Sequence, residues 1–136
     1  SEDDEGIATR VHGDLHLGQM LLDSRGTWQI VDFEGEPLRP LEERRAMDSP
    51  ARDVAGMLRS FDYAGQADTT GNQEWVDTAQ QAFLSGYNSR RQLSETDILR
   101  LRTYLLEKAL YELQYESKFR PSWKRIPLSA IRALTR

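Results

Sequence analysis

Several features are missing from this chain of 136 residues, and each absence excludes a class of protein. It has no cysteine, so disulfides and thiolate metal sites are excluded, in keeping with a reducing compartment. No apolar run approaches the ~18 residues that a membrane-spanning helix needs, so we expect no membrane association. Basic residues do not predominate, because 18 Lys and Arg stand against 22 Asp and Glu, which argues against a nucleic-acid partner. The acidic start is the reverse of a signal peptide, and we expect a soluble, cytoplasmic protein.

What is present indicates an ordinary globular unit. The content of 38% hydrophobic and 29% charged residues is typical of soluble domains. The length fits one domain or lobe, since domains most often have about 100–150 residues. Residues 1–6 are acidic and carry almost nothing apolar, so we expect a flexible end there.

Residues 7–36 have a short, β-like pattern. The apolar runs Gln19–Leu22 and Thr27–Phe33 are separated by Asp23–Gly26, whose residue types favour a turn. This pattern predicts one small β-hairpin. The following segment, Glu34–Asp48, contains two prolines and a charge cluster and is expected to be an exposed loop.

Residues 49–136 have helical periodicity. Ser94 and Asp97 form a capping pair at the start of the longest helix, and Pro121 must end it. The expected helices start at Ser49–Pro50 and break at Gly65–Asn72, span Trp75–Asn88 and Glu95–Phe119, and resume at Pro127.

The residues that suggest chemistry are concentrated near the start of the chain. Its two histidines, His12 and His16, bracket Asp14 in the order His-Gly-Asp-Leu-His. Gln19 follows, and Asp32 opens the run Asp-Phe-Glu-Gly after the expected hairpin. Phosphoryl transfer needs a carboxylate that accepts the hydroxyl proton and oxygen ligands that hold magnesium on the nucleotide phosphates. Kinases place these groups in a catalytic loop and in an Asp-Phe-Gly run beyond it, and the spacing here fits that pattern.

At these residues the sequence resembles the aminoglycoside phosphotransferase and choline kinase branch of the protein-kinase-like fold. Within it, Gln19 and the run Val31–Pro37 are similar to those of the maltokinases, and the resemblance extends to Ser49–Met57 and the long helix. It implies ATP-dependent phosphorylation of maltose to maltose 1-phosphate in bacterial trehalose and glycogen metabolism. Trehalose synthase is then an implied partner.

The resemblance also implies roles for individual residues. Asp14 would be the catalytic base, and Gln19 and Asp32 would hold Mg²⁺ with ATP as co-substrate. The residues expected to organise the catalytic loop are His12, His16, Glu34 and Asp53.

A sugar-binding face is expected on the long helix. Lys108, Tyr111 and Tyr115 stand at i, i+3 and i+7, which places them on one face. Tyrosine rings pack against sugar C–H groups, and a lysine donates hydrogen bonds to hydroxyls. The alternative is that both tyrosines pack against a neighbouring helix. Similarity to the maltokinase acceptor site favours the sugar-binding interpretation.

The expected fold class is therefore mainly α with a small β-hairpin, as in the C-terminal lobe of an aminoglycoside phosphotransferase-like kinase covering residues 1–136. A glycine-rich nucleotide loop and a strand lysine are absent from the sequence. We therefore expect the N-terminal nucleotide lobe to be missing and the isolated lobe to be an incomplete enzyme.

Two other functions remain open at this point. His12, Asp14 and His16 alternate along the chain and could serve a metal-dependent hydrolase. The lobe could also be a non-catalytic docking module for a trehalose-synthase partner, although such a module would not need both Asp14 and Asp32.

Overall fold

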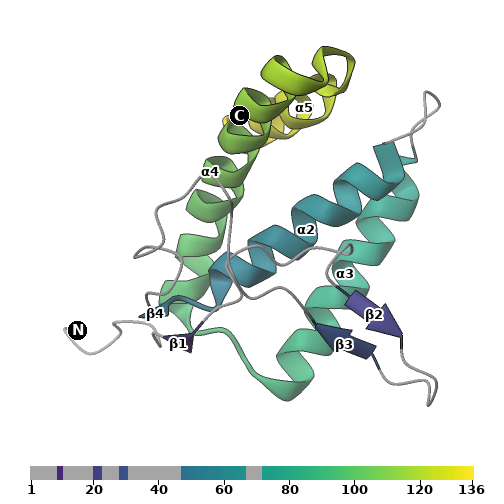
Figure 1. Ribbon diagram of the computed structural model, residues 1–136. Helices are drawn as coiled ribbons and strands as arrows, with labels where there is room; N and C mark the ends of the chain where they lie inside the picture. The colour runs from purple at the N-terminus through teal and green to yellow at the C-terminus, as the bar shows by residue number, and fades with distance from the viewer. Residues whose placement is uncertain (1–8, 11–19, 23–27, 31–46, 67–71) are drawn as a thin grey trace.

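The computed structural model describes residues 9–10, 20–22, 28–30, 47–66 and 72–136, with side chains from residue 49 onward (Figure 1). The helical elements are α2 (Ala51–Gln66), α3 (Gln73–Arg90), α4 (Glu95–Phe119), the short 3-10 helix η2 (Pro121–Trp123) and α5 (Arg125–Leu134). The strands are β1 (Thr9–Arg10), β2 (Met20–Leu22), β3 (Trp28–Ile30) and β4 (Met47–Asp48).

Helix α2 is the centre of the helical part. It packs against α3 on one side and α4 on the other, and α5 packs against α4 (Figure 1). Buried Val54 and Leu58 of α2 contact Leu93, which precedes α4. The partly buried side chains packed on this cluster are Phe83, Leu84, Tyr87, Leu101 and Leu105. Because α2 packs against both α3 and α4, its residues can take part in a site that is shared with either helix.

The helix ends follow from local chemistry. Ser94 caps α4 by accepting a hydrogen bond of 3.0 Å from the backbone N–H of Asp97, as the capping pair predicts. Asn72 caps α3 in the same way, with a 3.0 Å bond from the backbone N–H of Trp75. Ser49 accepts at 3.2 Å from the backbone N–H of Ala51 and donates its hydroxyl to the buried carboxylate of Asp97. This bond ties the start of α2 to the start of α4.

The predicted helix bounds are largely confirmed. Helix α4 has the predicted span, and α3 is two residues longer at each end than the predicted Trp75–Asn88. Helix α5 starts before Pro127 because proline is tolerated in the first turn of a helix. The turn of 3-10 helix at Pro121 was not predicted.

The fold class predicted from the sequence is wrong in its β part. The described residues form two short two-stranded antiparallel sheets where one was expected: β2 pairs with β3 within the two runs of the expected hairpin, and β1 pairs with β4. In the β1–β4 sheet Thr9 is opposite Asp48 and Arg10 is opposite Met47, so β4 lies in the segment expected to be a loop. Pairing between segments so distant in sequence leaves no local turn signal, which is why the pattern missed it.

The predicted flexible end at residues 1–6, the turn at Asp23–Gly26 and most of the segment 7–36 lie outside the described residues. Of the helices that are described, none is both long enough and apolar enough to cross a membrane.

Candidate functional site

The predicted catalytic loop falls in the part of the chain that the structure does not describe. Its residues are His12, Asp14, His16, Gln19, Asp32 and Glu34. The flanking strands are described: Met20 and Ile30 are opposite each other in the β2–β3 sheet. The juxtaposition predicted for the two metal ligands stays a prediction.

Asp53 lies in the first turn of α2 and is partly buried. It contributes, after burial, to raising the pKa of the Tyr87 hydroxyl. The catalytic-loop backbone that Asp53 is expected to anchor lies outside the described residues, so this role also stays a prediction.

The three residues predicted to bind sugar lie along α4. The Lys108 Nζ lies 5.1 Å from the ring centre of Tyr111, so these two side chains are in contact. Tyr115 is 40% exposed, and its ring centre is 4.9 Å from that of Phe119. Tyr115 is therefore not part of the core, and its ring can be reached from solvent, as the sugar-binding interpretation requires.

A buried ion-pair network joins α2 to the same stretch of α4. The guanidinium of Arg59 donates to both carboxylate oxygens of Glu112, with Nε at 3.0 Å from Oε1 and Nη2 at 3.1 Å from Oε2. Arg59 also donates to Asp62 one turn along α2. All three side chains are largely shielded from water. A bidentate guanidinium–carboxylate pair in such a setting fixes the two helices in one register.

Burial has the largest effect on the pKa of both partners in this network. Burial raises the pKa of the Glu112 carboxyl, although Arg59 and Lys108 act in the opposite direction. For Arg59, burial lowers the pKa, but Glu112 and Asp62 together outweigh that effect and raise it. The guanidinium therefore stays charged, while the carboxylate on α4 is held in a medium that disfavours its ionised form.

One turn beyond Glu112, the carboxylate of Glu116 has 0% exposure. Its Oε1 accepts a hydrogen bond of 2.9 Å from Nε of Arg120. Its Oε2 is buried and has no hydrogen-bond partner. Among the described residues, Glu116 Oε2 is the buried side-chain oxygen that has no hydrogen-bond partner.

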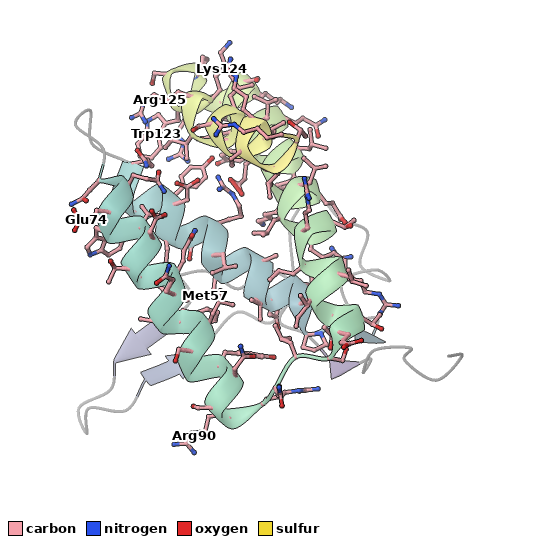
Figure 2. The ribbon with its side chains drawn as sticks, turned by 180° about the vertical axis from the view of Figure 1, so that it is seen from behind. Met57, Glu74, Arg90, Trp123, Lys124 and Arg125 are labelled. Atoms are coloured by element: carbon pink, nitrogen blue, oxygen red, sulfur yellow. The ribbon has the colours of Figure 1, made fainter. Side chains whose placement is uncertain are left out.

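Aromatic rings border the network. The rings of Tyr63 on α2 and Trp123 on η2 are stacked at 6.3 Å with an interplanar angle of 20°. The Arg120 guanidinium lies 4.2 Å from the ring centre of Trp123. Burial raises the pKa of the Tyr63 hydroxyl, and the charges of Glu112 and Glu116 raise it further. Figure 2 shows Trp123 and Arg125 at the end of the lobe where the C-terminal elements approach α2. Arg125 donates a hydrogen bond of 2.9 Å to the backbone carbonyl of Gln66.

The site that the structure adds to the prediction thus combines carboxylates, a guanidinium and flat rings. Sequence reasoning selected the tyrosines of α4 and passed over the glutamates beside them. A signal was available: Tyr111–Glu112 and Tyr115–Glu116 repeat the same dipeptide four residues apart. Two glutamates at i and i+4 repel each other on a helix surface, so their repetition indicates partners from another element. Among the described residues, no three His, Cys, Asp or Glu side chains form a group that could hold a metal ion.

Comparison with known proteins relates the chain to sugar kinases. No protein-family model matches it. A glucosamine kinase of Streptacidiphilus jiangxiensis is 33% identical over 129 residues, which is 86% of this chain and 29% of that protein. A glucosamine kinase of Mycolicibacterium smegmatis is 31% identical over 134 residues, which is 90% of this chain and 33% of that protein.

Solved structures lead to the same group. A glucosamine kinase in complex with glucosamine, ADP and inorganic phosphate matches with a TM-score of 0.78 and 28% identity, over 92% of this chain and 34% of that one. Another crystal form of glucosamine kinase matches with a TM-score of 0.77 and 29% identity, over 92% of this chain and 34% of that one. The chain spans about a third of the length of the relatives it matches.

These matches correct the expected fold assignment. The solved structures named above are glucosamine kinases, and they do not support the predicted assignment to an aminoglycoside phosphotransferase-like lobe. The predicted resemblance to a sugar kinase is confirmed at that level, whereas the matched relatives are named for glucosamine and not for maltose. The chain is similar, over nearly all its length, to one third of a glucosamine kinase.

Proposed function

We propose that this chain is part of an enzyme that transfers the γ-phosphoryl group of ATP to a hydroxyl group of a sugar. One observation carries the proposal: 92% of the chain superimposes, with a TM-score of 0.78, on a glucosamine kinase that was solved with glucosamine, ADP and inorganic phosphate. A nucleotide and a sugar are the two substrates that this reaction needs. The motif His-Gly-Asp-Leu-His supports the same reaction independently.

In this proposal Asp14 accepts the proton of the attacking sugar hydroxyl. The oxygen–phosphorus bond to the sugar forms as the bond between the γ-phosphorus and ADP breaks, and the proton goes to the Asp14 carboxylate. Gln19 and Asp32 offer an amide oxygen and a carboxylate, the donor types that suit Mg²⁺, and they would hold this ion, which neutralises phosphate charge when bound. His12, His16, Glu34 and Asp53 would keep the catalytic loop in position.

The acceptor would lie along α4. The exposed ring of Tyr115 and the contact between Lys108 and Tyr111 offer a flat apolar surface beside an ammonium group, which suits a sugar. Glucosamine is the first candidate because the relatives are named for it. Maltose is the second, on the resemblance of the loop residues to maltokinases. The maltose alternative places the enzyme in trehalose and glycogen metabolism, with trehalose synthase as a partner.

The test measures ADP release by the full-length protein that contains this chain, with ATP and each sugar in turn. We expect Mg²⁺-dependent ADP release with glucosamine above the rate without sugar, and release that is about 10²–10⁴-fold slower from the Asp14→Asn variant. Preferential turnover of maltose would establish the second candidate. Absence of ADP release with every sugar would contradict the proposal, and sugar-ester or phosphate-ester hydrolysis without nucleotide would favour the metal-dependent hydrolase. Binding of trehalose synthase without any turnover would favour the docking module.

A further inference from the structure

The side chains of Ser49 and Asp97 form a buried contact that the site described so far does not use. Ser49 is 3% exposed and Asp97 is 1% exposed, and the Ser49 hydroxyl donates a hydrogen bond to Oδ1 of Asp97. The Ser49 oxygen also accepts a hydrogen bond of 3.2 Å from the backbone N–H of Ala51. A hydroxyl has one proton to donate, so the two bonds together fix the direction in which the Ser49 side chain points.

Asp97 is unusual for a residue in the first turn of a helix because it is buried. Its backbone N–H donates to the capping residue Ser94 at 3.0 Å, as in an ordinary cap. In a capping box the acidic side chain at this position reaches back to the backbone of the cap, whereas here Oδ1 accepts from Ser49. Burial of a carboxylate is costly unless it is hydrogen-bonded. Since Ser94 already caps α4, the buried carboxylate serves the contact with Ser49.

Ser49 occupies the junction between a strand and a helix. It follows β4 directly and precedes α2, and β4 is paired with β1, where Thr9 is opposite Asp48. Figure 1 shows this pair of strands beside the start of α2. Strand β1 ends at Arg10, four residues before Asp14 in the sequence. A contact that fixes Ser49 therefore fixes the strand pair that leads into the predicted catalytic loop.

The same contact lies near Asp53 in the first turn of α2. Burial raises the pKa of the Tyr87 hydroxyl on α3, Arg91 acts in the opposite direction, and the charges of Asp53 and Asp97 raise this pKa further. Both carboxylates therefore act on one hydroxyl. This places Asp97 in the neighbourhood of the residue that is expected to organise the catalytic loop.

We propose that Asp97 is a positioning residue for the phosphoryl transfer: through Ser49 it holds β4 and β1 in the place from which the following segment presents Asp14 to the sugar hydroxyl. This inference rests on the proposed function and adds a residue outside the predicted catalytic loop. In this role Asp97 contacts no substrate and acts on the reaction only through the position of Asp14. Because a displacement of about 1 Å can lower a rate by about 10²-fold, one hydrogen bond at this junction can control turnover.

The experiment measures kcat and the two KM values of the full-length protein by ADP release, well below its Tm. Ser49→Ala removes the donor and should lower kcat by about 10–100-fold. The KM for ATP should change less than about threefold, because Gln19 and Asp32 adjoin the other sheet, β2–β3, in the sequence. The KM for the sugar should change equally little, since the proposed acceptor face lies further along α4.

A second comparison separates positioning from a purely structural role. In an Asp14→Asn background, Ser49→Ala should cause no further loss of kcat, because a residue that acts only through Asp14 then has nothing left to position. A purely structural role predicts a lower Tm and the same loss of kcat in both backgrounds. The matched control is Ser60→Ala in α2, whose hydroxyl donates to the backbone carbonyl of Met57 at 2.7 Å, and its kcat should be unchanged.

If Ser49→Ala does not fold, Ser49→Cys keeps the shape of the side chain with a weaker donor and should lower kcat by about 3–10-fold. An unchanged kcat in the folded Ser49 variant, or an equal loss of kcat with and without Asp14→Asn, would overturn the inference. Wild-type turnover that Ser49→Ala matches rejects this inference and leaves the proposed function standing. A wild type that releases no ADP with any sugar rejects the proposed function itself.

Discussion

Replacing Gly65 by alanine should destabilise the protein, although the same change in most helices is stabilising. Gly65 lies in the last turn of α2. A Cβ atom added there would lie 2.2 Å from Cγ2 of Val76 and 3.1 Å from Cε3 of Trp75, whereas ordinary contact begins at about 3.4 Å. Val76 is 1% exposed and β-branched, so its methyl group has no other rotamer into which to move easily. Helices α2 and α3 would have to separate.

The magnitude follows from two opposing effects. Alanine favours a helix over glycine by about 0.5–1 kcal/mol, while overpacking a filled core costs about 1–3 kcal/mol. The deep overlap with a buried side chain selects the upper part of the second range, for a net loss of about 1–2 kcal/mol. For a protein of this size that corresponds to a fall of about 3–10 °C in Tm.

The assay is thermal and urea unfolding of Gly65→Ala beside Gly86→Ala. Gly86 is in α3 with nothing within 4 Å of the added atom, so alanine there should stabilise by about 0.5–1 kcal/mol. A Val76→Ala change removes the methyl group that is struck, so the double variant Gly65→Ala/Val76→Ala should lose less stability than the sum of its parts. Stabilisation by Gly65→Ala comparable to that of Gly86→Ala would refute the reasoning.

Three further predictions concern the site. Asp14→Asn should lower kcat by about 10²–10⁴-fold with the affinity for ATP nearly unchanged. Asp32→Ala should also abolish Mg²⁺-dependent nucleotide binding. Identical nucleotide titrations of the two variants would contradict the assigned roles. Tyr115→Ala should raise the KM for the sugar by about 5–30-fold with kcat unchanged, because about 1–2 kcal/mol of aromatic contact is lost. The exposed position of Tyr115 predicts little change in Tm. An unchanged KM would show that Tyr115 is not part of the sugar site. Arg59→Met should cost about 3–5 kcal/mol at neutral pH because the Glu112 carboxylate is left buried without its partner. Because the folded-state pKa of Glu112 is raised, the loss of unfolding free energy in Arg59→Met should become smaller as the pH falls through that pKa and Glu112 is protonated. Urea unfolding that shows the same loss at pH 7 and at mildly acidic pH would contradict this prediction.

The helical part could be predicted because its signals are local. A capping serine, an apolar period and a following proline each act within one or two turns, so the span of α4 follows from Ser94 and Pro121. The pairing of β1 with β4 depends on contacts between distant segments and is not encoded in either segment alone. Sequence patterns carry local signals, so they locate helices better than they locate pairings between distant strands.

The candidate site shows the same difference between local signals, which the sequence carries, and long-range contacts, which it does not. The tyrosines of α4 were selected because their types and spacing are typical of a sugar-binding face, and their role stays a prediction. Glu112 and Glu116 were missed because periodicity selects apolar residues as buried. Glu112 is buried beside Arg59, a partner that lies about fifty residues away in the sequence. A buried charge is a property of the packed pair and not of either residue.

The contact between Arg125 and the carbonyl of Gln66 affects where this chain can be shortened. A cation from the segment beyond α4 neutralises the negative end of the α2 dipole, and Trp123 beside it covers Tyr63. The last sixteen or so residues therefore close off the end of a helix that began seventy residues earlier. A version truncated after Arg120 would keep every predicted catalytic residue and the tyrosines of α4, and yet would lose the cation at the end of α2 and the ring that covers Tyr63. Deletion mapping that follows motif boundaries alone would therefore remove contacts that hold the end of α2 in place.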